Sequence, residues 1–86
     1  MKKEIDVPEY RKEQGLKLEW EYGFSIECNI EGNVVVIKAN REGLISLARH
    51  CLTLAQQEVP LGSHLHLDES NALEDGSSEL ILARQD

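Results

Sequence analysis

The stretch GSHLHLD, residues 62–68, places two histidines and one aspartate at every second position. On a strand, alternate side chains project in parallel about 6.6 Å apart, so His64 and His66 could share one zinc ion. Asp68 would lie about 13 Å from His64 and could not easily complete the same site. Further ligands would have to come from the same sheet face, where the candidates are Glu79, Glu19 and Glu27. An isolated histidine pair is a weak signal for zinc, so a small metal-binding or hydrolytic domain is the alternative interpretation.

The favoured interpretation of the same stretch is a half-buried strand. Leu65 and Leu67 alternate with the histidines and point to the opposite face. If the leucines contact a helix, then His64, His66 and Asp68 face outward, toward solvent or a partner.

Other arrangements that could support catalysis carry less weight. Ser63 and His64 are neighbours on a strand and point to opposite faces, so they do not form a nucleophile and its base. The isolated glycines form no phosphate-binding loop. Carboxylates occur in close pairs, without any sign of a cleft that would raise one pKa, at Glu19/Glu21 and Glu74/Asp75. We therefore expect no catalytic residues, no cofactor and no enzyme.

Length and charge limit the possible partners. The 86 residues are enough for one small domain, and 41% hydrophobic with 29% charged residues is a globular composition. Lys and Arg number 9 against 16 Asp and Glu, a net charge of −7 that opposes binding to nucleic acid and to anionic membranes. The natural partner is basic. No stretch has the length of a membrane span or the pattern of a leader, so we expect a soluble, cytoplasmic protein.

The two cysteines, Cys28 and Cys51, fall on the apolar faces of a predicted strand and a predicted helix. Neither belongs to a C-x-x-C pair, which disfavours a metal site. We expect both as reduced thiols in the core.

The elements that must position these residues follow from the hydrophobic pattern. Residues 1–15 are polar and predict a tail or a short edge strand, and the remaining residues, 16–86, predict a single domain. Apolar residues alternate with polar ones over 16–22 and again over 24–30, which predicts two strands with one buried face each. A turn at 31–33 leads to a third strand, 34–39, which is apolar on both faces and is therefore expected at the centre of the sheet.

From Asn40 the period changes to that of a helix. Asn40 is a good N-cap, and apolar residues recur at helical spacing, predicting an amphipathic helix over 41–57. Gly43 in its first turn would permit close contact of the helix with the sheet or with a partner, unless it is simply a poor helix former that packing tolerates. The polar face is assigned to Arg41, Ser46, Arg49, His50, Thr53, Gln56 and Gln57.

Two more strands, 63–68 and 78–84, follow the helix and are joined by the polar loop 69–77. The predicted order is β-β-β-α-β-β. The fold class is α+β, with one long amphipathic helix packed on one face of a largely antiparallel sheet of about five strands. The opposite face would form a rigid, carboxylate-rich platform. Its candidate partner-binding residues are Glu19, Glu21, Glu27, His64, His66, Asp68 and Glu79.

The second half of the chain resembles a known bacterial family. The residues that carry the likeness are ANREGLISLARHCLTLAQ (39–56), VPLGSHLHLD (59–68) and LEDGSSELILAR (73–84), and the preceding hairpin fits as well. These segments are similar to the immunity protein 32 family of bacterial polymorphic toxin systems. The resemblance implies a small α+β protein without catalysis, encoded beside a secreted toxin, that binds and neutralises that toxin inside the producing cell.

The resemblance and the charge together favour a toxin inhibitor that acts through an acidic surface. A nuclease toxin would be basic and would suit such an inhibitor. The loop 69–77 is a further candidate contact. Two copies could also meet through the outward sheet face, so the sequence leaves a monomer and a homodimer open.

Overall fold

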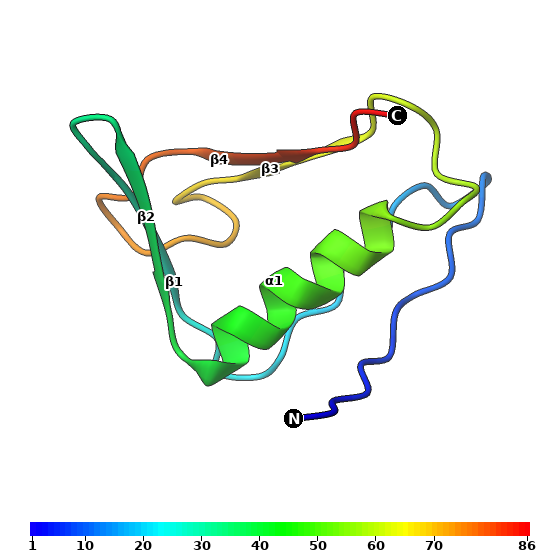
Figure 1. Cartoon of the computed structure of the whole chain (residues 1–86), viewed down its shortest axis with the longest axis horizontal. Coiled ribbons are helices and arrows are strands. Elements are labelled where there is room, and N and C mark those ends of the chain that lie inside the picture. The colour runs from blue at the N-terminus through cyan, green and yellow to red at the C-terminus, as the bar shows by residue number, and fades with distance from the viewer.

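The computed structural model describes all of the chain, residues 1–86, as an α+β fold with four strands and one helix (Figure 1). The elements in chain order are β1 (Ile26–Glu31), β2 (Val34–Ala39), α1 (Arg41–Leu54), β3 (His64–Leu67) and β4 (Leu80–Ala83). No helix is long and apolar enough to cross a membrane.

The strands form two separate antiparallel pairs. β1 pairs with β2 from Ile26 opposite Ala39 to Glu31 opposite Val34, and β3 pairs with β4 from His64 opposite Ala83. Gly32, with a φ of 62°, occupies the turn between β1 and β2 and confirms the predicted hairpin. In Figure 1 the β1–β2 hairpin stands across one end of the molecule, and β3 and β4 run above α1.

The prediction of one sheet with about five strands and a long helix was wrong. The structure has two sheets of two strands each, with order β1-β2 and β3-β4. The segment 74–78 runs beside β1, where Glu74 N–H donates to Ile26 O (2.9 Å) and Ser78 N–H donates to Cys28 O (2.7 Å). The loop that precedes β4 therefore occupies the edge of β1 that another strand would need.

The predicted strand over 16–22 is absent. This segment is held to the helix by Glu21 N–H, which donates to Ser46 Oγ (2.9 Å), and by Trp20, whose ring contacts His50 of the helix edge-on with centroids 4.2 Å apart. Tyr22, predicted to point inward, is fully exposed. Alternating hydrophobicity here reflects an extended segment packed on a helix rather than a strand in a sheet.

The third predicted strand is present as β2, but not at the centre of a sheet. Val34, Val35 and Ile37 have 58%, 60% and 40% of their surface exposed. An apolar pattern on both faces did not mean burial, because β2 has only one neighbouring strand.

The helix begins where the sequence predicts. Asn40 Oδ1 accepts the N–H groups of Gly43 (2.8 Å) and Ser25 (3.0 Å), and its Nδ2 donates to Gly23 O (2.9 Å). One side chain therefore caps α1 and ties it to the chain that enters β1. Gly43 makes the close contact that the sequence predicts, since a Cβ there would lie 2.5 Å from Ser25 O.

The helix ends at Leu54, three residues before the predicted end. The last carbonyl group of the helix finds a partner just beyond the last strand, because the Arg84 guanidinium donates to Leu54 O (3.0 Å). The same guanidinium also donates to Gln56 O, two residues past the helix. Gln56, predicted inside the helix, instead contacts the N-terminal segment. Its Nε2 donates to Pro8 O, and its Oε1 accepts Tyr10 N–H, both at 2.9 Å.

The predicted division of α1 into apolar and polar faces was wrong. Ser46, His50 and Thr53 are buried, whereas Leu44 and Leu52 are about half exposed. The segment before β1 packs on the face that carries these polar residues, which Ser46 Oγ and the Trp20–His50 ring contact illustrate. Two of the three buried polar residues, Ser46 and Thr53, have hydrogen-bond partners that offset the cost of their burial.

The hydrophobic core is small and lies between the two sheets and the helix. Its buried centre consists of Ile26, Cys28, Leu67 and Leu73, with Trp20, Phe24, Leu47 and Leu80 among the residues packed around it. Of the two cysteines, both free, Cys28 is buried as expected, but Cys51 is exposed and is no core residue.

Candidate partner-binding site

The β3 strand confirms the predicted alternation of GSHLHLD. Leu65 and Leu67 are 7% and 1% exposed and face the core, whereas His64 and His66 are exposed on the opposite side. The two imidazole rings lie edge to face with their centroids 4.9 Å apart. Both histidines therefore belong to the outward surface of the β3–β4 sheet.

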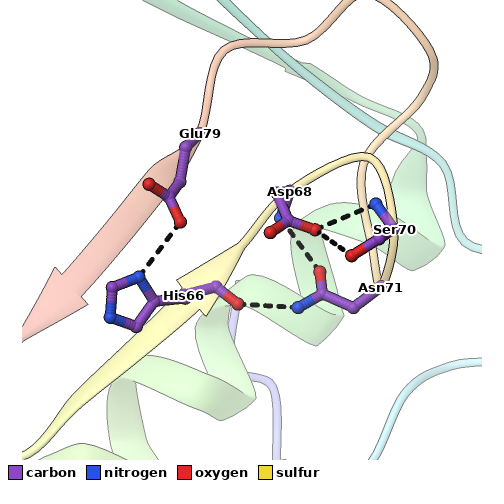
Figure 2. Close-up of polar contacts among 5 residues, drawn as sticks. All are labelled: His66, Asp68, Ser70, Asn71 and Glu79. Atoms are coloured by element: carbon purple, nitrogen blue, oxygen red, sulfur yellow. Dashed lines mark hydrogen bonds and ion pairs between the residues drawn. The ribbon is translucent and has the colours of Figure 1, made fainter.

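A carboxylate holds the second histidine. His66 Nδ1 lies 3.0 Å from Glu79 Oε2, and both side chains are about half exposed (Figure 2). Glu79 immediately precedes β4, whose Ile81 is the direct partner of His66 in the ladder. His64 makes a different contact, in which Nδ1 donates to Gly62 O (2.9 Å). The neighbouring rings are therefore oriented by different partners.

The metal interpretation finds no complete ligand set. No group of three or more His, Cys, Asp or Glu side chains lies close enough together to hold a metal ion. His66 has Glu79 beside it, but His64 directs its Nδ1 to the backbone. The geometry provides hydrogen bonding and charge rather than a coordination site.

Asp68 stands at the end of β3 and organises the loop that follows. Its Oδ1 accepts both Ser70 Oγ–H (2.6 Å) and Ser70 N–H (2.9 Å), and these hydrogen bonds lower the pKa of the Asp68 carboxyl below its ordinary value. Asn71 braces the same turn, because its Oδ1 accepts Asp68 N–H and its Nδ2 donates to His66 O, both at 2.9 Å (Figure 2). The carboxylate is therefore ionised and fixed in direction at neutral pH.

The remaining predicted platform residues lie elsewhere. Glu21 forms an ion pair with Arg49 on α1 (3.1 Å), and Arg49 also donates to Glu19 O (3.4 Å). Glu27 lies on β1 directly opposite Lys38. The structure thus brings His64, His66, Asp68 and Glu79 to one region. Glu19, Glu21 and Glu27 do not belong to the β3–β4 sheet.

Sequence reasoning missed how unevenly the charge is distributed along the chain. Six of the 16 acidic residues and none of the nine Lys and Arg residues lie within 50–83, so this stretch carries six of the seven net negative charges. We call it the acidic stretch. Its carboxylates are Glu58, Asp68, Glu69, Glu74, Asp75 and Glu79. The sequence does contain the signal for this stretch, namely the absence of Lys and Arg over the whole of 50–83. Inspection of short motifs one at a time does not detect it.

None of these six carboxylates forms an ion pair with Lys or Arg. Several are held by neutral donors instead: Glu69 accepts Gly76 N–H (2.7 Å) and Glu74 accepts Ser25 Oγ–H (2.8 Å). These hydrogen bonds fix the direction of the carboxylates without neutralising them. The loop 69–77 and its flanks therefore present uncompensated negative charge on an ordered backbone.

Comparison with known proteins gave one match. Residues 34–85, more than half of the chain, match the model of the protein family described as Immunity protein 32. The matched range includes β2, α1, β3 and β4, and with them the whole acidic stretch. No curated protein and no solved structure matches the chain.

Proposed function

The chain belongs to the immunity protein 32 family, as its resemblance to that family predicts, and on this premise we propose that it binds and neutralises a cognate protein toxin. The match over residues 34–85 is the observation that carries the proposal. Proteins of such families are generally not enzymes. The action we propose is therefore stoichiometric binding, which takes place in the cytoplasm of the cell that produces the toxin.

The surface we assign to toxin binding is the part of the acidic stretch from Asp68 to Glu79. It combines three properties that favour docking to a basic protein. Its carboxylates lack Lys and Arg partners, its loop backbone is braced by Asn71, and the adjacent β3–β4 face adds His66 and the half-exposed Ile81. Long-range attraction would accelerate association, and the directed carboxylates would supply specific hydrogen bonds.

A basic toxin of this kind would be a nuclease, because an enzyme that binds phosphate backbones carries a positively charged site. Carboxylates of the inhibitor would then occupy positions where phosphate groups of the substrate bind. The net charge of −7, concentrated in one stretch, supports this choice over a toxin with an acidic or apolar target site.

The first experiment co-expresses the protein with the toxin domain encoded by the adjacent gene and follows growth of the host. We expect the chain to restore growth and to form a complex of equal stoichiometry with the toxin. Growth that stays arrested, with no complex formed, would reject the proposed function.

The second experiment locates the surface by charge reversal. Asp75→Lys combined with Glu79→Lys should reduce the association rate by roughly tenfold or more at low salt, and the difference should shrink as salt rises. The matched control is Glu9→Lys with Glu13→Lys, which makes the same change of net charge in the N-terminal segment. Equal loss of binding in both double variants would show that only the total charge matters and would reject this surface.

A further inference from the structure

The outer edge of β2 is the one strand edge of its sheet that no other part of the chain covers. The opposite edge, on β1, receives hydrogen bonds from Glu74 and Ser78. By contrast, no backbone group of residues 34–39 forms a hydrogen bond to a segment outside its own sheet. Unpaired N–H and C=O groups along an exposed apolar strand are a template for pairing with another strand.

The register identifies which backbone groups point outward. Cys28 lies directly opposite Ile37, and Cys28 O points away from β2 because it accepts Ser78 N–H. Cys28 and Ile37 are therefore a non-hydrogen-bonded pair of the antiparallel ladder, in which both residues direct their N–H and C=O groups away from each other. Ile37 and, two residues earlier, Val35 therefore present free N–H and C=O groups along the outer edge of β2.

The side chains at this edge are apolar on the face that continues the core. Val35 is paired with Ile30 and Ile37 with Cys28, and paired residues point to the same side of a sheet. Cys28 is buried, but Ile30 and Val35 are 61% and 60% exposed. The apolar face of the hairpin that packs on the core near Cys28 therefore continues toward the turn, where it is exposed. This is the end of the hairpin that projects in Figure 1.

We propose that a second copy of this chain pairs with β2, antiparallel, about a two-fold axis that passes beside Val36. In this register Val35 of each copy exchanges both backbone hydrogen bonds with Ile37 of the other. The two hairpins become one four-stranded sheet with the order β1-β2-β2-β1. A sheet of this size is stable where a two-stranded one is marginal.

The register matches apolar residues with apolar residues on the core face. The residues that lie opposite one another across the four strands form a row, which consists of Ile30 and Val35 of one copy followed by Ile37 and Cys28 of the other. The symmetry repeats the same row on the other side of the axis. A single strand sequence therefore supplies both halves of the interface.

Charge complementarity on the opposite face selects the same register. Lys38 is the only charged residue of β2, and in this pairing it lies opposite Val34 of the second copy. Beyond Val34, in the same row, lies Glu31 of that copy, because Glu31 and Val34 are paired in the hairpin. A lysine side chain is long enough to cross the valine, so the dimer gains two Lys38–Glu31 pairs. The neighbouring registers place Lys38 opposite the turn or opposite Val36 and give no such pair.

A pair of short strands buries a small area, so the dimer forms reversibly and depends on concentration. This inference does not rest on the proposed function, because the outer edge of β2 lies outside the region assigned to the toxin. Failure of one proposal leaves the other intact.

Sedimentation equilibrium over a wide range of concentration tests the proposal. We expect the mass to rise reversibly from 9.7 kDa toward twice that value. Val35→Lys should weaken the dimer by roughly tenfold or more, since it places a charge in the apolar row. The matched control is Ile81→Lys, which alters a half-exposed residue on β4 and should leave the dimer unchanged. A single 9.7 kDa species at every concentration, or equal effects of the two lysine variants, would overturn the proposal.

Charge exchange and amide hydrogen exchange test the register itself. Glu31→Lys alone should weaken the dimer several-fold, and adding Lys38→Glu should restore part of the loss. In the unmodified protein, the amides of Val35 and Ile37 should become protected from exchange as concentration rises, whereas Val36, already bonded within the hairpin, should change little. Unprotected amides at Val35 and Ile37 in a confirmed dimer would place the contact elsewhere and overturn this proposal, whether or not the lysine variant folds.

Discussion

His50 is the titratable side chain whose surroundings differ most from water. The ring is fully buried, lies edge-on to Trp20 with centroids 4.2 Å apart, and has no hydrogen-bond partner on either nitrogen. Burial, followed by the nearby positive charge of Arg49, lowers the pKa of His50 from 6.5 to about 4. The folded protein therefore holds a neutral histidine inside its core.

This lowered pKa predicts a loss of stability in mild acid. Between pH 4 and pH 6.5 the unfolded chain protonates His50 and the folded chain does not, so proton binding favours the unfolded chain. The free energy of unfolding therefore has its full value above pH 6.5 and decreases as the pH falls toward 4. The free energy of unfolding should decrease by about 3 kcal/mol over this window on account of His50. Urea unfolding at several pH values measures the change.

Two variants isolate that contribution. His50→Leu should remove most of the dependence on pH between 6.5 and 4, whereas the control His64→Leu, at an exposed position, should retain it. Equal pH profiles for His50→Leu and the unmodified protein would show that other groups cause the acid sensitivity.

At this scale the sequence predicted some residues well and others poorly. The cap at Asn40 and the alternation of Leu65 and Leu67 with the histidines depend on near neighbours in the chain, and both were confirmed. The burial of His50 depends on Trp20, thirty residues earlier, so helical periodicity alone assigned the histidine to the solvent side.

The approach of α1 to the start of β1 depends on one missing side chain. A Cβ at Gly43 would lie 2.5 Å from Ser25 O and 2.9 Å from Ile26 Cγ1. Alanine in a helix is favoured over glycine by about 1 kcal/mol, but contact with a backbone oxygen cannot be relieved by a rotamer change. Gly43→Ala should therefore lower the free energy of unfolding by about 1 to 3 kcal/mol, measured by urea titration.

Leu44→Ala is the control for this substitution. Leu44 is the next residue of α1 and is 56% exposed, so its truncation should cost little. A Gly43→Ala protein as stable as the unmodified one would mean that the helix can move away from β1 without loss.

The elements show where local patterns are insufficient. Four predicted strands and the helix correspond to observed elements, with ends displaced by at most three residues. Their pairing was not predictable, because the segment 74–78 takes the edge of β1 that a single large sheet would use. Residues 16–22 have the alternating pattern of a strand but no partner strand. Whether a partner strand is available depends on the rest of the fold, so the pattern of these seven residues cannot predict it.

At the scale of the whole molecule, the N-terminal segment is joined to the helix. Arg49 Nε donates to Asp6 O, and Gln56 exchanges hydrogen bonds with Pro8 and Tyr10, all at 2.9 Å. Gln56→Ala should release this segment, so trypsin should cleave after Arg11 and Lys12 several-fold faster. Time courses followed by mass spectrometry measure the rate.

The neighbouring glutamine provides the comparison. Gln57 is exposed and forms no hydrogen bond to the segment, so Gln57→Ala should be cleaved at the original rate. Cleavage that is equally fast in all three proteins would show that these hydrogen bonds do not hold the segment in solution.

The structure brings some of the candidate partner-binding residues together and places others elsewhere. His64, His66 and Asp68 lie in one region because they are close in sequence, and Glu79 joins them because it immediately precedes β4, the partner of β3, and contacts His66. Glu19, Glu21 and Glu27 were added on the assumption of a single sheet, which the fold does not have. Whether either group binds a partner stays a prediction.

The two free cysteines allow transient opening of the fold to be measured by thiol labelling. Cys51 is exposed on α1, whereas Cys28 is 1% exposed at the centre of the core. An alkylating reagent would therefore modify one thiol at once and the other only during transient opening of the fold. The ratio of the two labelling rates would give the free energy of that opening in buffer without denaturant, with no engineered probe.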